Sequence, residues 1–99
     1  MNYIFSYDIT SDKLRNRLVK KLETNGCVRI QKSLFIGVNF NTKEVKLLKN
    51  IIEKELNSTL KEDSDSFLCL PITQTQKNKI WWLEPQPCPN FKLNNVAFL

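Results

Sequence analysis

The Asp8 carboxylate is the side chain best placed to do chemistry in this sequence of 99 residues. Residues 2–9 are rich in β-branched and aromatic types and predict a strand, and Thr10 or Ser11 can cap a following helix. Asp8 is therefore expected near the carboxyl end of a strand, where a side chain can reach a cleft. The alternative is that Asp8 only supports the turn before the helix, a common role for Asp at such a position.

One carboxylate alone makes a poor metal site. Two copies of Asp8 related by a two-fold axis would supply the oxygen ligands that Mg²⁺ accepts while it keeps several waters. The cation would relieve the repulsion between the two carboxylates. It would also polarise a phosphate and activate water for phosphodiester cleavage, without any need for histidine.

The cationic residues are concentrated in the first third of the chain. Residues 1–37 hold seven Lys or Arg against three Asp or Glu, whereas residues 38–99 hold eight against seven. A localised basic surface suits a polyanion such as nucleic acid, and the alternative is a solvated helix face. Because guanidinium groups bind phosphate oxygens in pairs, Arg15, Arg17 and Arg29 are suited to hold phosphate. The outward cations of the predicted helix are Lys13, Arg17, Lys20 and Lys21.

Phe35 shares a predicted strand face with Arg29, since residues two apart on a strand point the same way. The Phe35 ring is therefore a candidate contact for a base or for a second copy of the chain. Packing in the core or in an interface is the alternative.

Several kinds of chemistry are excluded by composition. The sequence has no histidine, which rules out Ser-His-Asp and Cys-His catalysis and zinc sites that contain His. The three cysteines form no C-x-x-C pair, and we expect buried free thiols in a reducing cytoplasm. They are Cys27, Cys69 and Cys88.

The remaining acidic residues suggest no metal site. Glu62, Asp63 and Asp65 lack the glycine and terminal glutamate spacing of a calcium loop, so we expect a solvated loop. Asp8 and Asp12 interrupt the apolar start of the chain, so no signal peptide is expected there. No stretch reaches the ~20 apolar residues of a membrane span. A cytoplasmic protein without a membrane partner is predicted.

The apolar periodicity predicts one domain over residues 1–83, built from alternating strands and helices. The predicted strands are residues 2–9, 27–36, 38–40, 67–72 and 79–83. The predicted helices run from Thr10 or Ser11 to about Asn25, with Gly26 after the end, and from Asn41 or Thr42 to about Leu56. Residues 57–64 are expected to form a loop and 73–78 a turn or a single helical turn. The order β-α-β-β-α-β is that of a ferredoxin-like α/β sandwich, an antiparallel sheet with both helices on one face.

Both faces of this sheet are apolar, although two helices can cover only one. In residues 67–72, Leu68, Leu70 and Ile72 face opposite to Phe67 and Cys69. The uncovered side would be an exposed apolar patch unless a second subunit covers it. We therefore predict a homodimer, formed through the sheet.

Residues 84–99 form a Pro-rich tail with an apolar end. Its prolines cannot donate ladder hydrogen bonds and favour an extended path. The apolar residues after them predict that the tail docks on its own dimer or on a partner, by strand addition. Fraying is the alternative.

Four segments resemble the CRISPR-associated protein two family, the small partner of the CRISPR integrase. The segments are Tyr7-Asp8-Ile9-Thr10, then Arg15-Asn16-Arg17-Leu18, then Gly26 followed by Arg29-Ile30-Gln31-Lys32-Ser33-Leu34-Phe35 and Gly37, and finally Asp65-Ser66-Phe67 through Leu70-Pro71-Ile72-Thr73. The resemblance covers about residues 1–83. The departures are minor, at Ser6 and Leu34.

The resemblance implies a ferredoxin-like homodimer that takes part in spacer acquisition in antiviral defence. It would bridge dimers of the integrase subunit and hold double-stranded DNA, and many members are described as Mg²⁺-dependent endonucleases that act on RNA or duplex DNA. By motif position, Asp8 would be the metal ligand and a catalytic residue, and Tyr7 the second catalytic residue. The accompanying site residues would be Arg15, Arg17, Arg29 and Phe35.

Three functions therefore remain open from the sequence. The first is a metal-dependent nuclease, or endoribonuclease. The second is a non-catalytic DNA-binding scaffold. The third is an unrelated ferredoxin-like module that binds a small ligand or RNA, which the absence of an RNA-recognition motif's signature disfavours.

Overall fold

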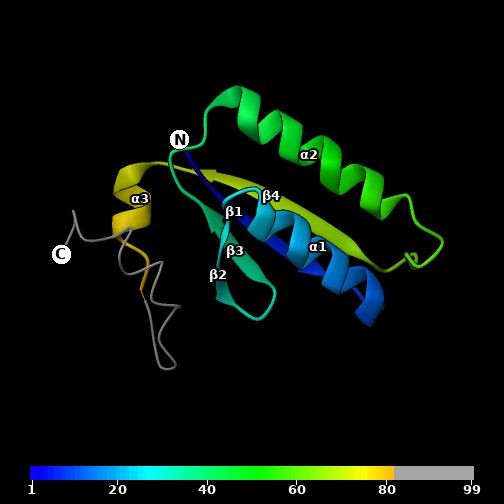
Figure 1. Cartoon of the computed structure of the whole chain (residues 1–99). Coiled ribbons are helices and arrows are strands. Elements are labelled where there is room, and N and C mark those ends of the chain that lie inside the picture. The colour runs from blue at the N-terminus through cyan, green and yellow to red at the C-terminus, as the bar shows by residue number, and fades with distance from the viewer. Residues whose placement is uncertain (82–99) are drawn as a thin grey trace.

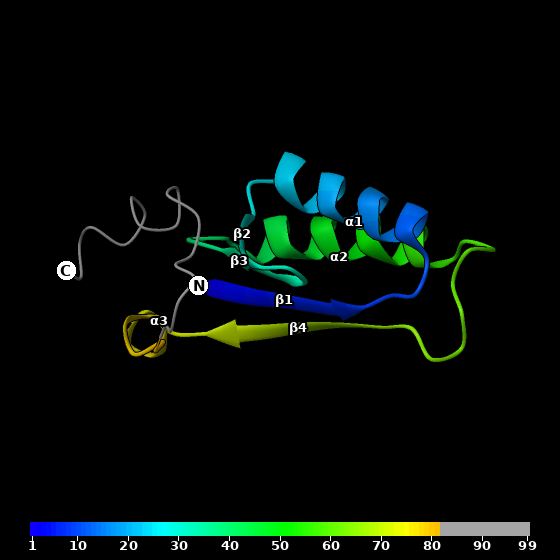
Figure 2. The same cartoon turned by 90° about the horizontal axis from the view of Figure 1, so that it is seen from below.

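A four-stranded antiparallel sheet carries two helices on one face in the computed structural model, which describes residues 1–81 (Figures 1 and 2). The strands are β1 (Asn2–Asp8), β2 (Val28–Gln31), β3 (Leu34–Gly37) and β4 (Ser66–Ile72). The helices are α1 (Asp12–Thr24), α2 (Thr42–Leu56) and the short α3 (Gln74–Asn78). The strand order β2-β3-β1-β4 and the chain order confirm the predicted ferredoxin-like βαββαβ sandwich.

Strand β1 lies in the middle of the sheet, between β3 and β4. Its register pairs Ile4 with Ile36 on one side and with Leu70 on the other. Because side chains alternate along a strand, Phe5 and Tyr7 point to the helix-covered face, and Ile4, Ser6 and Asp8 point to the other.

Helix α1 begins and ends where the sequence indicates. The Ser11 side chain accepts a hydrogen bond from the Leu14 amide at 3.2 Å and caps the first turn. At the other end Gly26 has φ +89°, a conformation that glycine adopts without strain. The amides of Gly26 and Cys27 donate to the carbonyls of Glu23 and Leu22 at 3.1 and 3.0 Å, which closes a Schellman motif.

The central part of the chain differs from the predicted strands. The strand predicted over 27–36 is a hairpin, in which β2 and β3 are joined by a turn at Lys32 and Ser33, with a register shift between Arg29 and Gln31. Neither turn residue takes a left-handed backbone, so the turn needs no Gly or Asn and leaves no signal in the sequence. Apolar residues of both strands still share one face, which makes the hairpin look like one longer strand.

Of the two further predicted strands, 38–40 is wrong, and 79–83 lies only partly within the described residues. Residues 38–40 form a loop in which Asn39 has φ 59° and the Phe40 ring packs directly on Gly37. Residues 79–81 form no strand. Residues 82–83 and the predicted docking tail, 84–99, lie outside the described part of the chain.

The main core fills the space between the sheet and the two long helices. Leu14, Leu18 and Leu22 of α1 are completely buried there, opposite Phe5 and Phe35 of the sheet. Cys27 and Cys69 adjoin this core as free thiols; Cys27 is buried, as predicted, whereas Cys69 is only half-buried, and Cys88 lies outside the described residues. Burial raises the pKa of Cys27 to about 12, so this thiol stays neutral and is a poor nucleophile at neutral pH.

The opposite face of the sheet is apolar and lies on the side away from α1 and α2 (Figure 2). Ile4, Ile36 and Leu34 pack together on it. Beside them, Leu68 is 57% exposed and Leu70 is 49% exposed. We call this surface, which comprises residues 4, 34, 36, 68 and 70, the open face. Within residues 1–81, no helix is long and apolar enough to cross a membrane.

Candidate active site and nucleic-acid interface

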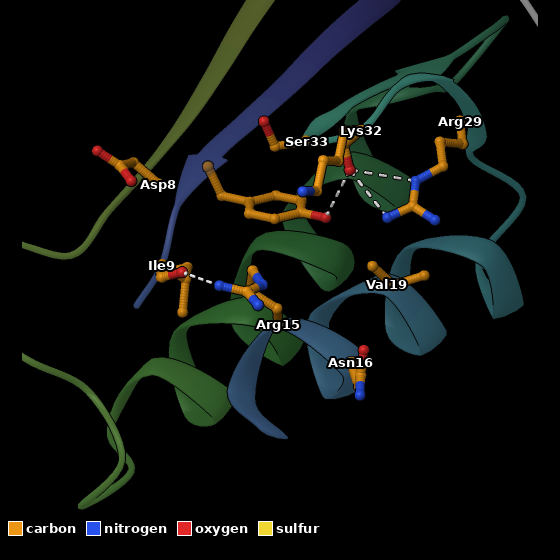
Figure 3. Close-up of a pocket in the computed structure, with 9 residues that line it drawn as sticks. Asp8, Ile9, Arg15, Asn16, Val19, Arg29, Lys32 and Ser33 are labelled. Atoms are coloured by element: carbon orange, nitrogen blue, oxygen red, sulfur yellow. Dashed lines mark hydrogen bonds between the residues drawn. The ribbon is translucent and has the colours of Figure 1, made fainter. Parts of the chain in front are cut away.

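Asp8 is the last residue of β1 and its side chain is exposed. It pairs with Ser66 of β4 and follows Ile4 and Ser6 on the open face. Figure 3 shows the Asp8 carboxylate pointing away from Arg15 and Arg29. Within the described part of the chain, no hydrogen bond or ion pair engages this carboxylate. Its oxygens are therefore available to an external ligand.

A pocket of about 350 Å³ adjoins Asp8, between the end of β1, helix α1 and the β2–β3 hairpin (Figure 3). Its lining residues are Tyr7, Asp8, Ile9, Arg15, Asn16, Val19, Arg29, Lys32 and Ser33. The fold thus brings together four of the predicted site residues, Tyr7, Asp8, Arg15 and Arg29, from three separate elements. The cations outnumber the single carboxylate in this lining, so the pocket suits an anionic ligand.

The Arg15 guanidinium is held against the loop that follows Asp8. Its Nη1 donates to the carbonyl oxygens of Ile9 at 2.9 Å and Thr10 at 3.2 Å, and the other terminal nitrogen pairs with Asp12. These bonds fix the cation beside the pocket while its side chain stays 36% exposed. A phosphate would therefore meet a charge that is already oriented.

Arg29 and Tyr7 both bind the turn of the hairpin. Nε and Nη2 of Arg29 donate to the Lys32 carbonyl oxygen at 3.2 and 2.8 Å, and the Tyr7 hydroxyl donates to the same oxygen at 3.3 Å. The Arg29 guanidinium also lies 5.4 Å from the centre of the Phe35 ring. This network ties the turn to the end of β1 and so sets the shape of the pocket.

The structure supports a place in the site for only one of the two predicted aromatic residues, Tyr7 and Phe35. Tyr7 is 5% exposed, with its ring stacked on Phe67, yet it lines the pocket. Phe35 is 0% exposed, because its strand face is the one that the helices and Arg29 cover. The prediction that Phe35 contacts a base is wrong for this fold, since its ring has no free surface for stacking. Its alternative role, packing in the core, is the one observed.

The other predicted cations lie outside the pocket. Lys13, Arg17, Lys20 and Lys21 are exposed on α1, and none of them lines the pocket. Lys21 also approaches Glu55 of α2 at 4.0 Å. These residues form a basic surface beside the pocket, and we call it the α1 basic face.

Asp65 is a polar residue that the sequence did not single out. The prediction of a solvated acidic loop is wrong for it, because its side chain is buried and is only 8% exposed. Oδ1 accepts hydrogen bonds from the Thr10 amide at 2.9 Å and the Thr10 hydroxyl at 3.0 Å, and Oδ2 accepts one from the Glu62 amide at 2.9 Å. The signal for this role was its place directly before a strand, within one of the segments that carry the family resemblance.

These contacts predict that Asp65 stabilises the fold above acidic pH. The hydrogen bond from the Glu62 amide, with those from Thr10, holds the pKa of Asp65 below its usual range, although burial opposes the shift. A carboxyl group whose pKa is lowered on folding stabilises the folded state when the pH is above its unfolded pKa of about 3.9. This stabilisation is lost as the pH falls through the pKa of the folded state. Asp65→Asn should therefore lower the melting temperature at pH 7, with a difference from wild type that shrinks below about pH 4. The exposed neighbour provides the control, since Asp63→Asn should leave the melting curve unchanged at both pH values, and an equal effect of the two variants would contradict the assignment.

Within residues 1–81, no three His, Cys, Asp or Glu side chains gather in a way that could bind an ion. Mg²⁺, however, is often held by one or two carboxylates and several waters. The exposed, unengaged Asp8 carboxylate fits such a site if two copies of the chain each contribute one.

The fold and the site define a small ferredoxin-like domain that places an exposed carboxylate beside a cationic pocket. The chain belongs to the CRISPR associated protein Cas2 family, whose model matches residues 1–80. This confirms the resemblance noted in the sequence. The pocket residues all lie within the matched part of the chain.

Two curated relatives and one solved structure are similar to this chain. CRISPR-associated endoribonuclease Cas2 1 of Archaeoglobus fulgidus is 33% identical over 75 residues, which cover 75% of this chain and 73% of the relative. CRISPR-associated endoribonuclease Cas2 2 of Pyrobaculum aerophilum is 39% identical over 54 residues, and the match spans only about half of each protein, 54% of this chain and 55% of the relative. The crystal structure of the hypothetical protein TT1823 from Thermus thermophilus matches with a TM-score of 0.68 at 22% identity, over 89% of this chain and 95% of that one, and this supports the fold.

Proposed function

We propose that this protein is a Mg²⁺-dependent endonuclease that acts as a homodimer in CRISPR adaptation, the acquisition of new spacers in antiviral defence. The observation that carries the proposal is the exposed, unengaged Asp8 carboxylate beside a pocket lined by Arg15, Arg29 and Lys32. Both relatives carry the name endoribonuclease, which favours RNA as a substrate.

A second copy of the chain is the proposed occupant of the open face. The exposed part of this face is formed by Leu68 and Leu70 of β4, beside the half-buried Ile4 of β1, and an exposed apolar surface of this kind is typical of an interface. Asp8 lies on the same side of β1 as Ile4, which belongs to the open face. A two-fold contact through this face therefore places two Asp8 carboxylates on one interface.

The proposed mechanism divides the work between the carboxylates and the cations. Asp8 of each copy would hold Mg²⁺, which when bound supplies Lewis-acid polarisation of a phosphate and an activated water. Arg15 and Arg29 bind the phosphate backbone, and both are already oriented by backbone carbonyl oxygens. Tyr7 keeps the hairpin turn in place through the Lys32 carbonyl, so its contribution is to hold the pocket.

The direct test is cleavage by the full-length purified chain. Labelled single-stranded RNA and duplex DNA are incubated with the protein in Mg²⁺ and, separately, in excess chelator. Mg²⁺-dependent cleavage of either substrate supports the proposed nuclease. Tight binding with no cleavage of either substrate would contradict it and favour the scaffold.

The scaffold is the second candidate function, and the α1 basic face favours it. Lys13, Arg17 and Lys20 extend the cationic surface beyond the pocket, further than binding a single nucleotide requires. A long cationic surface suits the backbone of duplex DNA. In this role the homodimer would bridge dimers of the CRISPR integrase subunit and hold DNA without cutting it.

Both functions predict that the α1 basic face binds phosphates. Arg17→Ala should weaken duplex binding by about three- to tenfold and reduce the slope of log affinity against log salt by about one. Fluorescence anisotropy over a range of salt concentrations measures both quantities. Arg15→Ala should have at least as large an effect, since Arg15 also supports the Ile9 and Thr10 carbonyls.

Lys79→Ala is the control for these variants. Lys79 is exposed and directly follows α3, at the other end of β4 from Ser66, the partner of Asp8 (Figure 2). Its replacement removes one positive charge but should leave the salt dependence close to that of wild type. If Arg17→Ala and Lys79→Ala gave the same small change, α1 would not be the binding surface.

A further inference from the structure

Two loops that are far apart in sequence are joined by hydrogen bonds close to Asp8. One is the segment from Ile9 to Ser11, which joins β1 to α1, and the other is the segment before β4 that ends at Asp65. Thr10 and Asp65 are 55 positions apart, yet both hydrogen-bond donors of Thr10, the amide and the hydroxyl, bind Oδ1 of Asp65. Asp65 itself lies next to Ser66, the residue that pairs with Asp8 across the sheet.

The backbone after Asp8 is fixed from two sides. Asp65 accepts the donors of Thr10, while Arg15 donates to the carbonyl oxygens of Ile9 and Thr10. The second oxygen of Asp65 binds the Glu62 amide, which anchors Asp65 in its own loop. The donors of Thr10 and the carbonyl oxygens of Ile9 and Thr10 thus all have hydrogen-bond partners.

The Asp8 side chain has no such support. Among the described residues nothing binds its carboxylate, so the position of its oxygens depends on the backbone that carries it. That backbone is held on one side by the β1–β4 ladder and on the other by the bonds of Thr10. A change at Thr10 or Asp65 would therefore reach Asp8 through the chain, without direct contact.

The geometry points to Asp65 as a positioning residue for the Asp8 carboxylate, acting through Thr10 to hold it where a divalent cation shared by two copies can bind. This inference rests on the proposed function and names a residue that the proposed mechanism does not use. Partners that orient metal ligands typically change metal affinity by about 10- to 100-fold when they are removed. Asp65 acts on Asp8 only through Thr10, so we expect a change in metal affinity near the lower end of this range.

Thr10 offers a matched pair of variants. Thr10→Val keeps the branched shape and the backbone amide but removes the hydroxyl donor to Asp65, whereas Thr10→Ser keeps that donor. The Thr10 side chain is exposed, so both variants should fold. Asp65→Asn is the stronger change, because its NH₂ group would meet either the Glu62 amide or the donors of Thr10.

The test measures Mn²⁺ binding to the full-length chain in the absence of nucleic acid, with electron paramagnetic resonance as the readout. Asp8→Asn first establishes which bound Mn²⁺ depends on Asp8. Thr10→Val should then raise the dissociation constant of that Mn²⁺ by about threefold and Asp65→Asn by about tenfold, while Thr10→Ser stays near wild type. Titrations well below the melting temperature of each variant separate this effect from loss of fold.

The outcomes distinguish this inference from the proposed function. If Asp8 is needed for Mn²⁺ binding but Thr10→Val and Asp65→Asn both bind as wild type does, Asp65 is not a positioning residue and the proposed metal site stands. If Thr10→Val and Thr10→Ser weaken binding equally, the hydroxyl bond to Asp65 is not the cause and the inference is overturned. If Mn²⁺ binding does not depend on Asp8, the proposed metal site fails and the inference fails with it.

Discussion

Asp8→Asn is expected to reduce Mg²⁺-dependent cleavage by at least about 100-fold, the scale of losing one electrostatic group that acts at the reacting centre. The substitution keeps the size of the side chain and removes its charge, so a cation loses a ligand from each copy of the chain. Binding of nucleic acid should stay within about twofold of wild type, because Arg15, Arg29 and the α1 basic face supply the phosphate contacts. Gel assays of cleavage and anisotropy measurements of binding test the two parts separately.

Asp63→Asn is the matched control for Asp8→Asn. It removes the same charge from an exposed loop position and should leave cleavage unchanged. Asp8→Ala should resemble Asp8→Asn, since neither side chain binds Mg²⁺ as a carboxylate does. Full activity in an Asp8→Asn preparation free of contaminating nuclease would remove Asp8 from the active site.

The long elements could be predicted because each carries its own local signals. Helix α1 has a capping Ser11 at its start, Gly26 after its end and Leu14, Leu18 and Leu22 at helical spacing. The β2–β3 hairpin carries no such signal, since Lys32 and Ser33 turn the chain without glycine. The local sequence pattern therefore predicted the architecture. It missed the β2–β3 hairpin, because the turn of this hairpin is set by the pairing of its two strands.

The candidate site shows the same division. Asp8, Arg15 and Arg29 could be named from the sequence because a strand end, a helix face and the family motifs each mark them. Phe35 was misassigned because alternation tells which residues share a strand face but not which face the helices cover. Asp65 was missed because its partner, Thr10, lies 55 positions away, and an acidic residue in a polar loop has the composition of a solvated one.

Leu68→Glu is expected to convert a dimer into a monomer. Leu68 is 57% exposed in a single copy and pairs with Ser6 of β1, so the charge costs little in the monomer but would be buried without a partner in a dimer formed through the open face. Burying an unpaired charge costs several kcal/mol, so the dissociation constant of the dimer should rise by more than about 100-fold. Sedimentation velocity over a range of concentrations measures this change.

Leu47→Glu is the control that tests whether the effect of Leu68→Glu is specific to the open face. Leu47 is 58% exposed on α2, on the helix side of the sheet, so it matches Leu68 in type and exposure but not in face. Its replacement should leave the dimer intact. Because Asp8 and Leu68 both belong to the side of the sheet that a second copy would cover, Leu68→Glu should also lose the cleavage that needs two Asp8 carboxylates, while Leu47→Glu keeps it. A monomeric wild-type chain at all concentrations, or a Leu68→Glu dimer as stable as wild type, would show that the open face is not the interface and that two Asp8 carboxylates do not meet across it.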